Sequence, residues 1–455
     1  MDKTTVALAA RVSALRFDDL SPSAIHEAER RIIDSIGCLF GGYGSEPACI
    51  ARTLAAASSG SPPARVLGSS LPTTMEMAAF ANTAALRYLD FNDTYIALGS
   101  GHPSDMLPAV LAVADAYRVR GRALLLAVAA SYEVFAVIAD TVHLRQRGWD
   151  QGVAIVLGSS AGTGKLLGLD ETQLGHALAI AVTANIPTRQ TRSAELSMWK
   201  GCATAAAARA GVFAALLAQL GMTGPSAAFE GRHGVWEQVT GPFEVASINA
   251  RESFAIERSN LKAFPTEYHS QAPLWLVDKL GSRVDVEDIE NIAVRTYHMA
   301  WSEIGSEPEK WRPRTRETAD HSLPYLLADA LRHGPVTLAA FDQERIGDPL
   351  THRLMDRITI SEEPAFTRRF PNEMVTEIEI ATRDGKRLVE QARYPRGHVL
   401  NPMTDEELER KFGMLCSPYL PESRRKACLD VIRGLHEDLD IGLLFDVTNI
   451  GGDER

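Results

Sequence analysis

The chain has few cysteines, and their spacing argues against two classes of site. Five cysteines occur in 455 residues, and none lies in a CxxC pair or beside a histidine at metal-ligand spacing. An odd number without such spacing favours a reducing compartment over a disulfide framework or a cysteine metal site. HExxH and spaced carboxylate sets are also missing, so we expect no metal.

Long apolar runs and basic tracts are missing as well. The longest apolar run, residues 123–139, is interrupted by Ser131, Tyr132 and Glu133. It is shorter than the ~20 residues of a bilayer crossing and predicts a buried helix. Residues 1–15 lack the apolar core of a secretory signal, and no basic tract carries interleaved aromatics. We therefore expect a cytoplasmic protein that binds neither nucleic acid nor a membrane.

The length and composition predict a globular chain of two domains. A hydrophobic fraction of 45% and a charged fraction of 23% are ordinary for such a protein, and 455 residues exceed one ordinary core. The net charge is −11. An acidic chain can still bind an anionic substrate, because a local cluster of Lys and Arg sets the field inside a cleft.

Helical patterns dominate the first part of the chain. Ser21-Pro22 has the residue types of a helix cap and first turn, and its helix is expected to close at Gly41-Gly42. Almost nothing alternates with period two, so residues 1–258 predict a large all-helical domain. Further helices are expected at residues 73–89, 107–118, 123–140, 153–167, 171–184 and 201–220.

The pattern changes after Ser259. Strands are expected at residues 289–297, 357–361, 376–381 and 387–393, with a hairpin turn at Asp384-Gly385. Residues 316–332 have a helical pattern, and residues 320–325 begin a helix. Residues 259–399 therefore predict a smaller α+β domain. Thr404 then caps new helices, and residues 400–455 are expected to rejoin the helical domain. The predicted fold is mainly α, with the α+β domain as an insertion.

Chemically active side chains are densest after the predicted helix at residues 73–89. Asp90 and Thr94 lie in LDFNDT (residues 89–94), and His102 follows in GHPSD (residues 101–105). On a helix, Asp90 and Thr94 would share a face at i, i+4. Acids, hydroxyls and an imidazole on the rim of a rigid element suit proton transfer at a carbon next to a carboxylate. The alternative is a helix end with a solvated polar loop, and spacing alone does not separate the two.

Basic side chains gather before the last helix of the first domain. Lys200 stands beside Trp199 at the start of a small-residue helix, with Arg189 and Arg192 just upstream. This arrangement suits a substrate carboxylate, and the alternative is a solvated helix end. A second segment, KAFPTEYHS (residues 262–270), lies near the predicted domain boundary, where clefts tend to form.

A glycine-rich stretch at residues 159–165, SSAGTGK, does not indicate a nucleotide site. The first glycine of a phosphate loop is replaced by Ser159, and Leu166 stands where Ser or Thr would hold magnesium. The stretch also lies inside a predicted helix. We therefore expect no nucleotide site at this stretch.

Seven segments follow one another along the chain in a characteristic order. They are DSIG (34–37) with Gly41-Gly42, LDFNDT with GHPSD, KLLGLD (165–170), LSMWKG (196–201), KAFPTEYHSQ (262–271), RETADHSLPY (316–325), and Gly397-His398 with NPMTDEEL (401–408). Together these segments resemble the MmgE/PrpD family.

The resemblance implies a cofactor-independent enzyme acting on a small di- or tricarboxylate, with a large helical domain, a smaller inserted α+β lid domain, and usually a homodimer. The family includes 2-methylcitrate dehydratases, cis-aconitate decarboxylase and an iminodisuccinate epimerase. All three exchange a proton at a carbon next to a carboxylate.

The resemblance also implies roles for individual residues. His102 or Asp90 would act as the base and Thr94 would orient the substrate, while cationic side chains would anchor its carboxylates. The general acid for a leaving hydroxyl is left open among His269, Glu267 and His321. The predicted catalytic residues are Asp90, Thr94, His102 and His269, and the predicted substrate-binding residues are Lys200, Lys262, Arg192, Glu267, His321 and Tyr325.

Two positions depart from the family pattern. Gln151 stands where many relatives read G-x-D-H, and Glu267 stands about where the decarboxylase branch has a histidine. LDFNDT and GHPSD look more like the dehydratase branch. The first hypothesis is a hydro-lyase that dehydrates a 2-methylcitrate-like hydroxy tricarboxylate by α-proton abstraction. The alternatives are a decarboxylase of an aconitate-like acid, an epimerase of an amino or imino dicarboxylate, and a silent carboxylate-binding relative.

Overall fold

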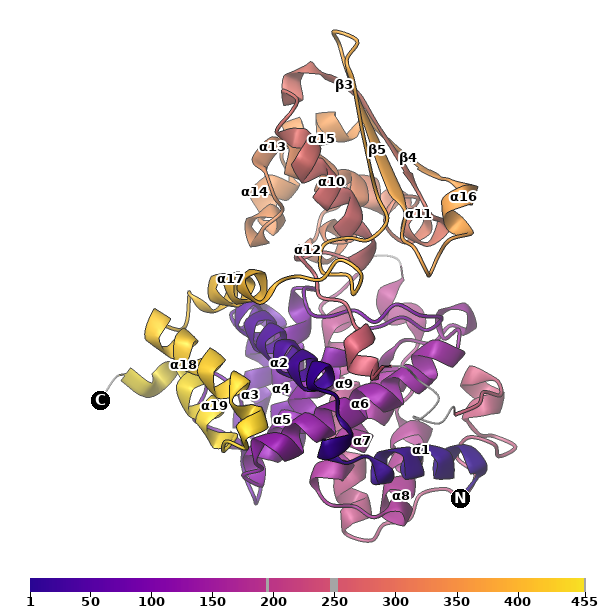
Figure 1. Cartoon of the computed structure of the whole chain (residues 1–455), viewed down its shortest axis with the longest axis vertical. Coiled ribbons are helices and arrows are strands. Elements are labelled where there is room, and N and C mark those ends of the chain that lie inside the picture. The colour runs from indigo at the N-terminus through magenta and orange to yellow at the C-terminus, as the bar shows by residue number, and fades with distance from the viewer. Residues whose placement is uncertain (194–195, 246–252, 454–455) are drawn as a thin grey trace. The chain divides into compact units, whose positions relative to one another are not determined.

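The computed structural model describes residues 1–193, 196–245 and 253–453, which form two compact units (Figure 1). Unit 1 comprises Met1–Arg192, Met198–Ser259 and Thr404–Arg455, and unit 2 comprises Ser193–Ser197 and Asn260–Met403. Helices hold 59% of the residues and strands 9%, which confirms a mainly α chain. The role of unit 2 as a lid stays a prediction.

Unit 1 is built from helices and one two-stranded ladder. The helices predicted between residues 73 and 220 are all observed, as α4 to α9. The elements are α1 (Lys3–Ala14), α2 (Pro22–Gly42), α3 (Glu46–Ala56), α4 (Met75–Tyr88), α5 (Leu107–Ala116), α6 (Gly121–Thr141), α7 (Gly152–Leu166), α8 (Glu171–Ala184), α9 (Trp199–Gln219), α17 (Asp405–Cys416), α18 (Glu422–Arg433), α19 (Gly442–Thr448), β1 (Ala64–Arg65) and β2 (Pro72–Thr73).

Small residues let the central helices of unit 1 approach closely. α7 and α9 pack against each other, α6 packs on α7, and α4 packs on α9. A Cβ atom added at Gly211 of α9 would lie 2.6 Å from Cβ of Ser159 in α7, so only glycine fits there. Likewise, a Cβ at Gly42 of α2 would lie 2.1 Å from the carbonyl oxygen of Ala85 in α4. Close helix approach is what brings polar side chains of different helices within reach of one another.

The predicted capping residues open their helices as expected. Ser21 accepts a hydrogen bond of 2.9 Å from the amide of Ala24, and Thr404 accepts one of 3.3 Å from Glu407. These bonds satisfy amide groups that have no partner inside the helix. α17 packs against α2, which places the C-terminal helices within the helical unit.

Two helices of unit 1, α6 and α9, are long and apolar enough to cross a membrane by length and composition. In the structure, 83% and 61% of their apolar windows are buried. Core helices of a globular protein pass the same test, so the two helices are weak support for a membrane span.

Unit 2 contains a four-stranded sheet in the order β4-β3-β5-β6. β3 pairs with β4 in parallel, and the other two pairings are antiparallel. The apolar faces of β3 and β5 join a core with α10 and α13. The elements are α10 (Gln271–Gly281), β3 (Ile289–Thr296), α11 (His298–Ile304), α12 (Arg316–Ala319), α13 (Leu323–His333), α14 (Gln343–Ile346), α15 (Pro349–Met355), β4 (Ile358–Glu362), α16 (Pro364–Thr367), β5 (Thr376–Thr382) and β6 (Arg387–Ala392).

The helical pattern predicted over residues 316–332 is observed as two helices, α12 and α13. Residues 320–322 separate them. Ser322 caps α13 by accepting from the amide of Tyr325, and Pro324 occupies the first turn, where its missing N–H has no cost. This break places Asp320 and His321 in a loop between two helices.

Candidate active site

Asp90, just after α4, has a left-handed backbone conformation although it is not a glycine. Asp90 has φ +51°, a region that costs an aspartate of order 1 kcal/mol and is often found at functional positions. Its Oδ1 lies 2.7 Å from Nη1 of Arg87, and its Oδ2 lies 3.2 Å from Nζ of Lys200 in α9. All three side chains are at most 5% exposed. A buried carboxylate thus stands between two cations.

His102 lies beside this carboxylate. Its Nε2 is 3.7 Å from Oδ1 of Asp90, while its Nδ1 is 2.7 Å from the carbonyl oxygen of Asp93 and 3.2 Å from Oγ1 of Thr94. A carbonyl oxygen only accepts hydrogen bonds, so in the neutral ring we place the proton on Nδ1. Nε2 then carries the lone pair and can accept a proton.

The middle of the LDFNDT segment anchors it in the interior. Asn92 donates to Oγ of Ser104 at 2.7 Å and to Oδ1 of Asp105 at 2.8 Å. Asp93 accepts from the amide of Ser104 at 2.9 Å and from the hydroxyl of Tyr132 at 2.8 Å. Because these groups are buried, each bond fixes the segment more firmly than it would in water.

Asp105 is a buried acid that the sequence reasoning did not single out. Burial raises its pKa to about 6, although Arg87, Thr204 and Arg192 favour the charged form. The Nε atom of Arg87 lies 3.5 Å from Oδ2 of Asp105. Arg87 therefore bridges Asp90 and Asp105. It could have been found from its i, i+3 spacing to Asp90 on the predicted helix.

The C-terminal part of the chain supports the same segment. Nζ of Lys411 in α17 donates to the carbonyl oxygen of Phe91 at 2.7 Å and lies 3.7 Å from the centre of its ring. The same nitrogen is 2.7 Å from Oδ1 of Asp34 in α2. Burial raises the pKa of Asp34, and Lys411 opposes this shift. The sequence offered no signal for this contact, because 320 residues separate Lys411 from Phe91.

Two residues at the start of α7 hold site residues in place. The side-chain oxygen Oε1 of Gln151 accepts a hydrogen bond of 2.6 Å from the main-chain N–H of His102. Oδ2 of Asp150 accepts one of 2.6 Å from Nε of Arg192. Burial disfavours the charged form of Asp150, but Arg192, the amide of Gly152 and the charge of Arg189 together outweigh burial, so the pKa of this carboxyl is lowered.

Arg192 retains a donor that an anion could use. Its Nη2 atom is buried and has no hydrogen-bond partner among residues 1–193, 196–245 and 253–453. Buried hydrogen-bond donors usually have a partner, so a donor without one needs an explanation. One explanation is that Nη2 of Arg192 binds a carboxylate of the substrate. The predicted anchoring role of Arg192 stays a prediction.

Unit 2 collects a second set of predicted residues. Lys262 is fully buried, and its Nζ donates to the carbonyl oxygen of Thr266 at 3.1 Å. Glu267 accepts from the amide of His269 at 2.6 Å through Oε2. Nδ1 of His269 lies 2.5 Å from the hydroxyl of Tyr297. These contacts hold the segment around residues 262–270 in a fixed conformation.

His321 forms a dyad with a buried carboxylate. Its Nδ1 is hydrogen-bonded to Oδ1 of Asp320, which is fully buried. The main-chain N–H of Glu267 donates to the carbonyl oxygen of Asp320 at 3.0 Å, so both predicted segments of unit 2 meet here. A carboxylate on Nδ1 sets the tautomer and orientation of an imidazole, as in catalytic dyads.

The structure places most predicted residues in these two groups, each within its own unit. Tyr325 is an exception, because it is fully buried in the core of unit 2 and its hydroxyl donates to the carbonyl oxygen of Ala340. Its predicted contact with substrate stays a prediction. Unit 1 groups Asp90, Thr94, His102 and Lys200, with Arg192 held on Asp150, and unit 2 groups Lys262, Glu267, His269 and His321.

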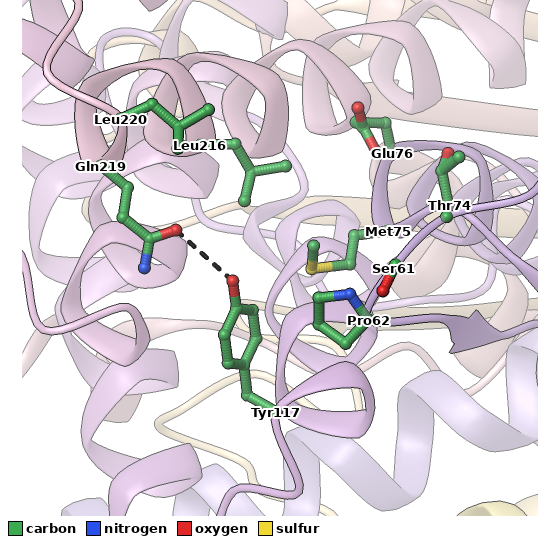
Figure 2. Close-up of a pocket in the computed structure, with 10 residues that line it drawn as sticks. Ser61, Pro62, Thr74, Met75, Glu76, Tyr117, Leu216, Gln219 and Leu220 are labelled. Carbon is green, nitrogen blue, oxygen red and sulfur yellow. Dashed lines mark hydrogen bonds between the residues drawn. The ribbon is translucent and has the colours of Figure 1, made fainter.

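A pocket at another place in unit 1 does not contain these residues. A cavity of about 300 Å³ lies between the start of α4 and the end of α9. Tyr117 and Gln219 line it, and the hydroxyl of Tyr117 donates to Oε1 of Gln219 at 3.4 Å (Figure 2). No predicted site residue lines it.

Within either unit taken by itself, the described residues bring no three His, Cys, Asp or Glu ligand atoms within 4.8 Å of one another.

Comparison with known proteins covers nearly the whole chain. The MmgE/PrpD N-terminal domain matches residues 6–247, and the MmgE/PrpD C-terminal domain matches residues 264–437. A 2-methylcitrate dehydratase of Cupriavidus necator is 29% identical over 84% of this chain and 84% of its own length. One of Salmonella typhimurium is 28% identical over 81% and 80%. The cis-aconitate decarboxylase of Homo sapiens is 27% identical over 96% and 92%.

Proposed function

The chain belongs to the MmgE/PrpD family, and from that premise we propose that it is a hydro-lyase which dehydrates a 2-methylcitrate-like hydroxy tricarboxylate. The observation that carries the proposal is the arrangement of His102 against Asp90 and Lys200. A proton acceptor, a fixed anion and an ammonium group lie together. The names of the two bacterial relatives support the choice of substrate class.

His102 is the base in this proposal. Both oxygens of Asp90 already contact cations, whereas Nε2 of His102 keeps its lone pair because Nδ1 is held by the carbonyl oxygen of Asp93. When Nε2 takes the α-proton, the resulting imidazolium faces the Asp90 carboxylate at 3.7 Å. That charge pair stabilises the protonated base, because an opposite charge nearby favours the charged form of the ring.

Cationic groups are needed as much as the base. The hydrogen on a carbon next to a carboxylate is a very weak acid, so its removal requires stabilisation of the charge that develops on the carboxylate oxygens. Lys200 and the buried Nη2 donor of Arg192 would supply that stabilisation. Thr94, hydrogen-bonded to His102, would help orient the ring and the substrate.

Departure of the hydroxyl needs a proton donor, for which three residues were predicted. His321 fits this role best on its own geometry, because its hydrogen bond to the buried carboxylate of Asp320 fixes Nδ1 and with it the orientation of the ring. The side chain of His321 is 15% exposed, whereas that of His269 is 4% exposed and contacts Tyr297. Glu267 uses one oxygen to cap a short helix.

Decarboxylation of an aconitate-like acid is the second candidate. The human cis-aconitate decarboxylase matches 96% of this chain. That match favours decarboxylation over epimerisation as the second candidate. Decarboxylation would use the same anchors without a leaving hydroxyl.

Proton NMR of the purified protein in deuterated buffer tests these proposals. The substrates are 2-methylcitrate, citrate, cis- and trans-aconitate and iminodisuccinate, each presented alone. New vinyl signals with loss of the hydroxy acid are expected. Release of carbon dioxide would establish the decarboxylase instead, and deuterium uptake without other change would indicate an epimerase. No change in any compound would contradict all three.

Variants of the two central residues test the assigned roles. His102→Asn should lower kcat by about 10²- to 10⁴-fold with little change in KM, because it removes a base. Lys200→Met should raise KM and also lower kcat, because it removes charge stabilisation from both states. Lys426→Met is the matched control, since Lys426 is an exposed lysine of the same unit. Wild-type activity in both test variants would refute this site.

A further inference from the structure

Gln151 makes a contact that the predicted chemistry does not use. It precedes α7, its side chain is buried, and its Oε1 accepts from the main-chain N–H of His102 at 2.6 Å. We propose that Gln151 is a positioning residue, which holds the backbone of His102 so that the ring keeps its Nδ1 on the carbonyl oxygen of Asp93 and its Nε2 toward Asp90. The catalytic consequence rests on the proposed function, but the positioning itself does not.

The local backbone explains why this bond matters. Tyr95 and Gly101 exchange main-chain hydrogen bonds of 2.8 and 3.0 Å, which close the loop between them. His102 is the first residue after that pair, and Pro103 after it has no N–H to donate. The N–H of His102 is therefore the donor through which the interior can fix the backbone at this point.

The packing around Gln151 is close enough to impose a geometry. A Cβ atom added at Gly101 would lie 2.2 Å from Oε1 of Gln151 and 3.0 Å from the ring of Phe135. Glycine at this position therefore allows the amide to reach His102. His102 is therefore held at two points. Its main-chain nitrogen is hydrogen-bonded to Gln151, and its ring nitrogen Nδ1 is hydrogen-bonded to the carbonyl oxygen of Asp93.

The chemistry of an amide suits this role. The oxygen of a glutamine side chain is an acceptor at every pH, whereas an imidazole in its place would donate or accept according to its tautomer and charge. A carboxylate would also accept, but it would add a negative charge near Asp90 and Asp105. Gln151 therefore holds His102 without an ionisation of its own, and the pH profile of turnover should contain no step from this position.

Histidine NMR tests the positioning independently of turnover. The chain has 12 histidines, and the ring signals of His102 are assigned by their absence in His102→Asn. Long-range proton–nitrogen spectra of the full chain report the tautomer. We expect one Nδ1–H tautomer in the wild type and in Gln151→Glu, which retains an acceptor oxygen. Gln151→Leu, which does not, should show a mixture of tautomers.

Kinetics of the same variants measure the catalytic consequence. Gln151→Leu should lower kcat by about 10- to 100-fold while KM changes by less than about threefold, because the base is misplaced but the anchors are intact. Gln151→Glu should recover at least part of kcat and add a pH-dependent step. Gln219→Leu is the matched control, since Gln219 lies in the pocket of Figure 2 at the far end of α9 from Lys200.

Gly101→Ala provides a second route if Gln151→Leu fails to fold. It keeps the glutamine but displaces its oxygen, so it should reproduce the tautomer mixture and the loss of kcat. Wild-type ring signals in both Gln151→Leu and Gly101→Ala would overturn the proposal. If the wild type turns over none of the tested acids, the proposed function fails while the tautomer spectra still decide whether Gln151 positions His102.

Discussion

Replacement of Asp90 by asparagine isolates the charge at the centre of the unit 1 cluster. Asparagine has the same shape and tolerates the left-handed backbone at φ +51°, so the change removes the charge and little else. Arg87 and Lys200, whose side chains are 1% and 5% exposed, would then face a neutral amide. Both cations would remain buried with less compensation.

The size of the effect follows from the distances. At 2.7 and 3.2 Å, two unit charges attract with about 6 and about 5 kcal/mol at an effective dielectric constant of about 20. Desolvation opposes most of this attraction, and removal of one partner from a buried pair typically costs about 3–5 kcal/mol. Arg87 keeps Asp105 at 3.5 Å, so we expect the lower end, about 3 kcal/mol.

Urea unfolding followed by circular dichroism at pH 7.5 measures this loss. Asp90→Gly is the variant matched to Asp90→Asn, because glycine adopts the same backbone conformation and also removes the charge. Its free energy of unfolding should fall by a similar amount. Asp90→Ala should lose about 1 kcal/mol more, from backbone strain alone. A loss below about 0.5 kcal/mol in Asp90→Asn, or strict additivity with Lys200→Met, would refute the electrostatic reasoning.

Two further predictions concern pH. Burial raises the pKa of Asp105 from 3.8 to about 6, so the folded state binds a proton at this carboxyl more tightly than the unfolded state does. The protonated carboxyl therefore adds its full contribution to the free energy of unfolding below pH 3.8, and this contribution is lost as the pH rises through 6. Asp105→Asn should abolish this dependence, which amounts to about 3 kcal/mol in urea titrations, and an unchanged slope would contradict the assignment. Burial lowers the pKa of His398 from 6.5 to about 4, so its neutral ring adds stability above pH 6.5 that is lost as the pH falls through 4. His398→Gln should remove about 3 kcal/mol of that acid dependence, and a variant as acid-sensitive as the wild type would show that another group is responsible.

Local patterns in the sequence predicted many of the helices. Helix caps such as Ser21 and Thr404 and the apolar periodicity predicted where helices lie, because both depend on residues close in sequence. The pattern over residues 316–332 did not show where α12 ends, since the apolar period continues across residues 320–322. Interruptions of this kind are decided by how the flanking helices pack.

The candidate site divides in the same way. Asp90, Thr94 and His102 could be proposed together because they lie within thirteen residues of one another, and the structure does group them. Lys411 could not, because the expected return of the C-terminal helices does not specify which of their side chains contacts Phe91. Gln151 was noted as a departure from the family pattern, but only the structure shows its bond to His102.

Buried charge in unit 1 is tolerable because several carboxylates meet cations from other parts of the chain. Asp150 contacts Arg192, and Asp34 in α2 contacts Lys411 in α17, so these segments are held together by charge as well as by apolar packing. Removing one member of such a pair leaves the other buried and uncompensated, which costs more than the pair contributes. The same matching keeps the Asp90 cluster rigid, and a rigid cluster is what lets His102 present one defined nitrogen to a substrate.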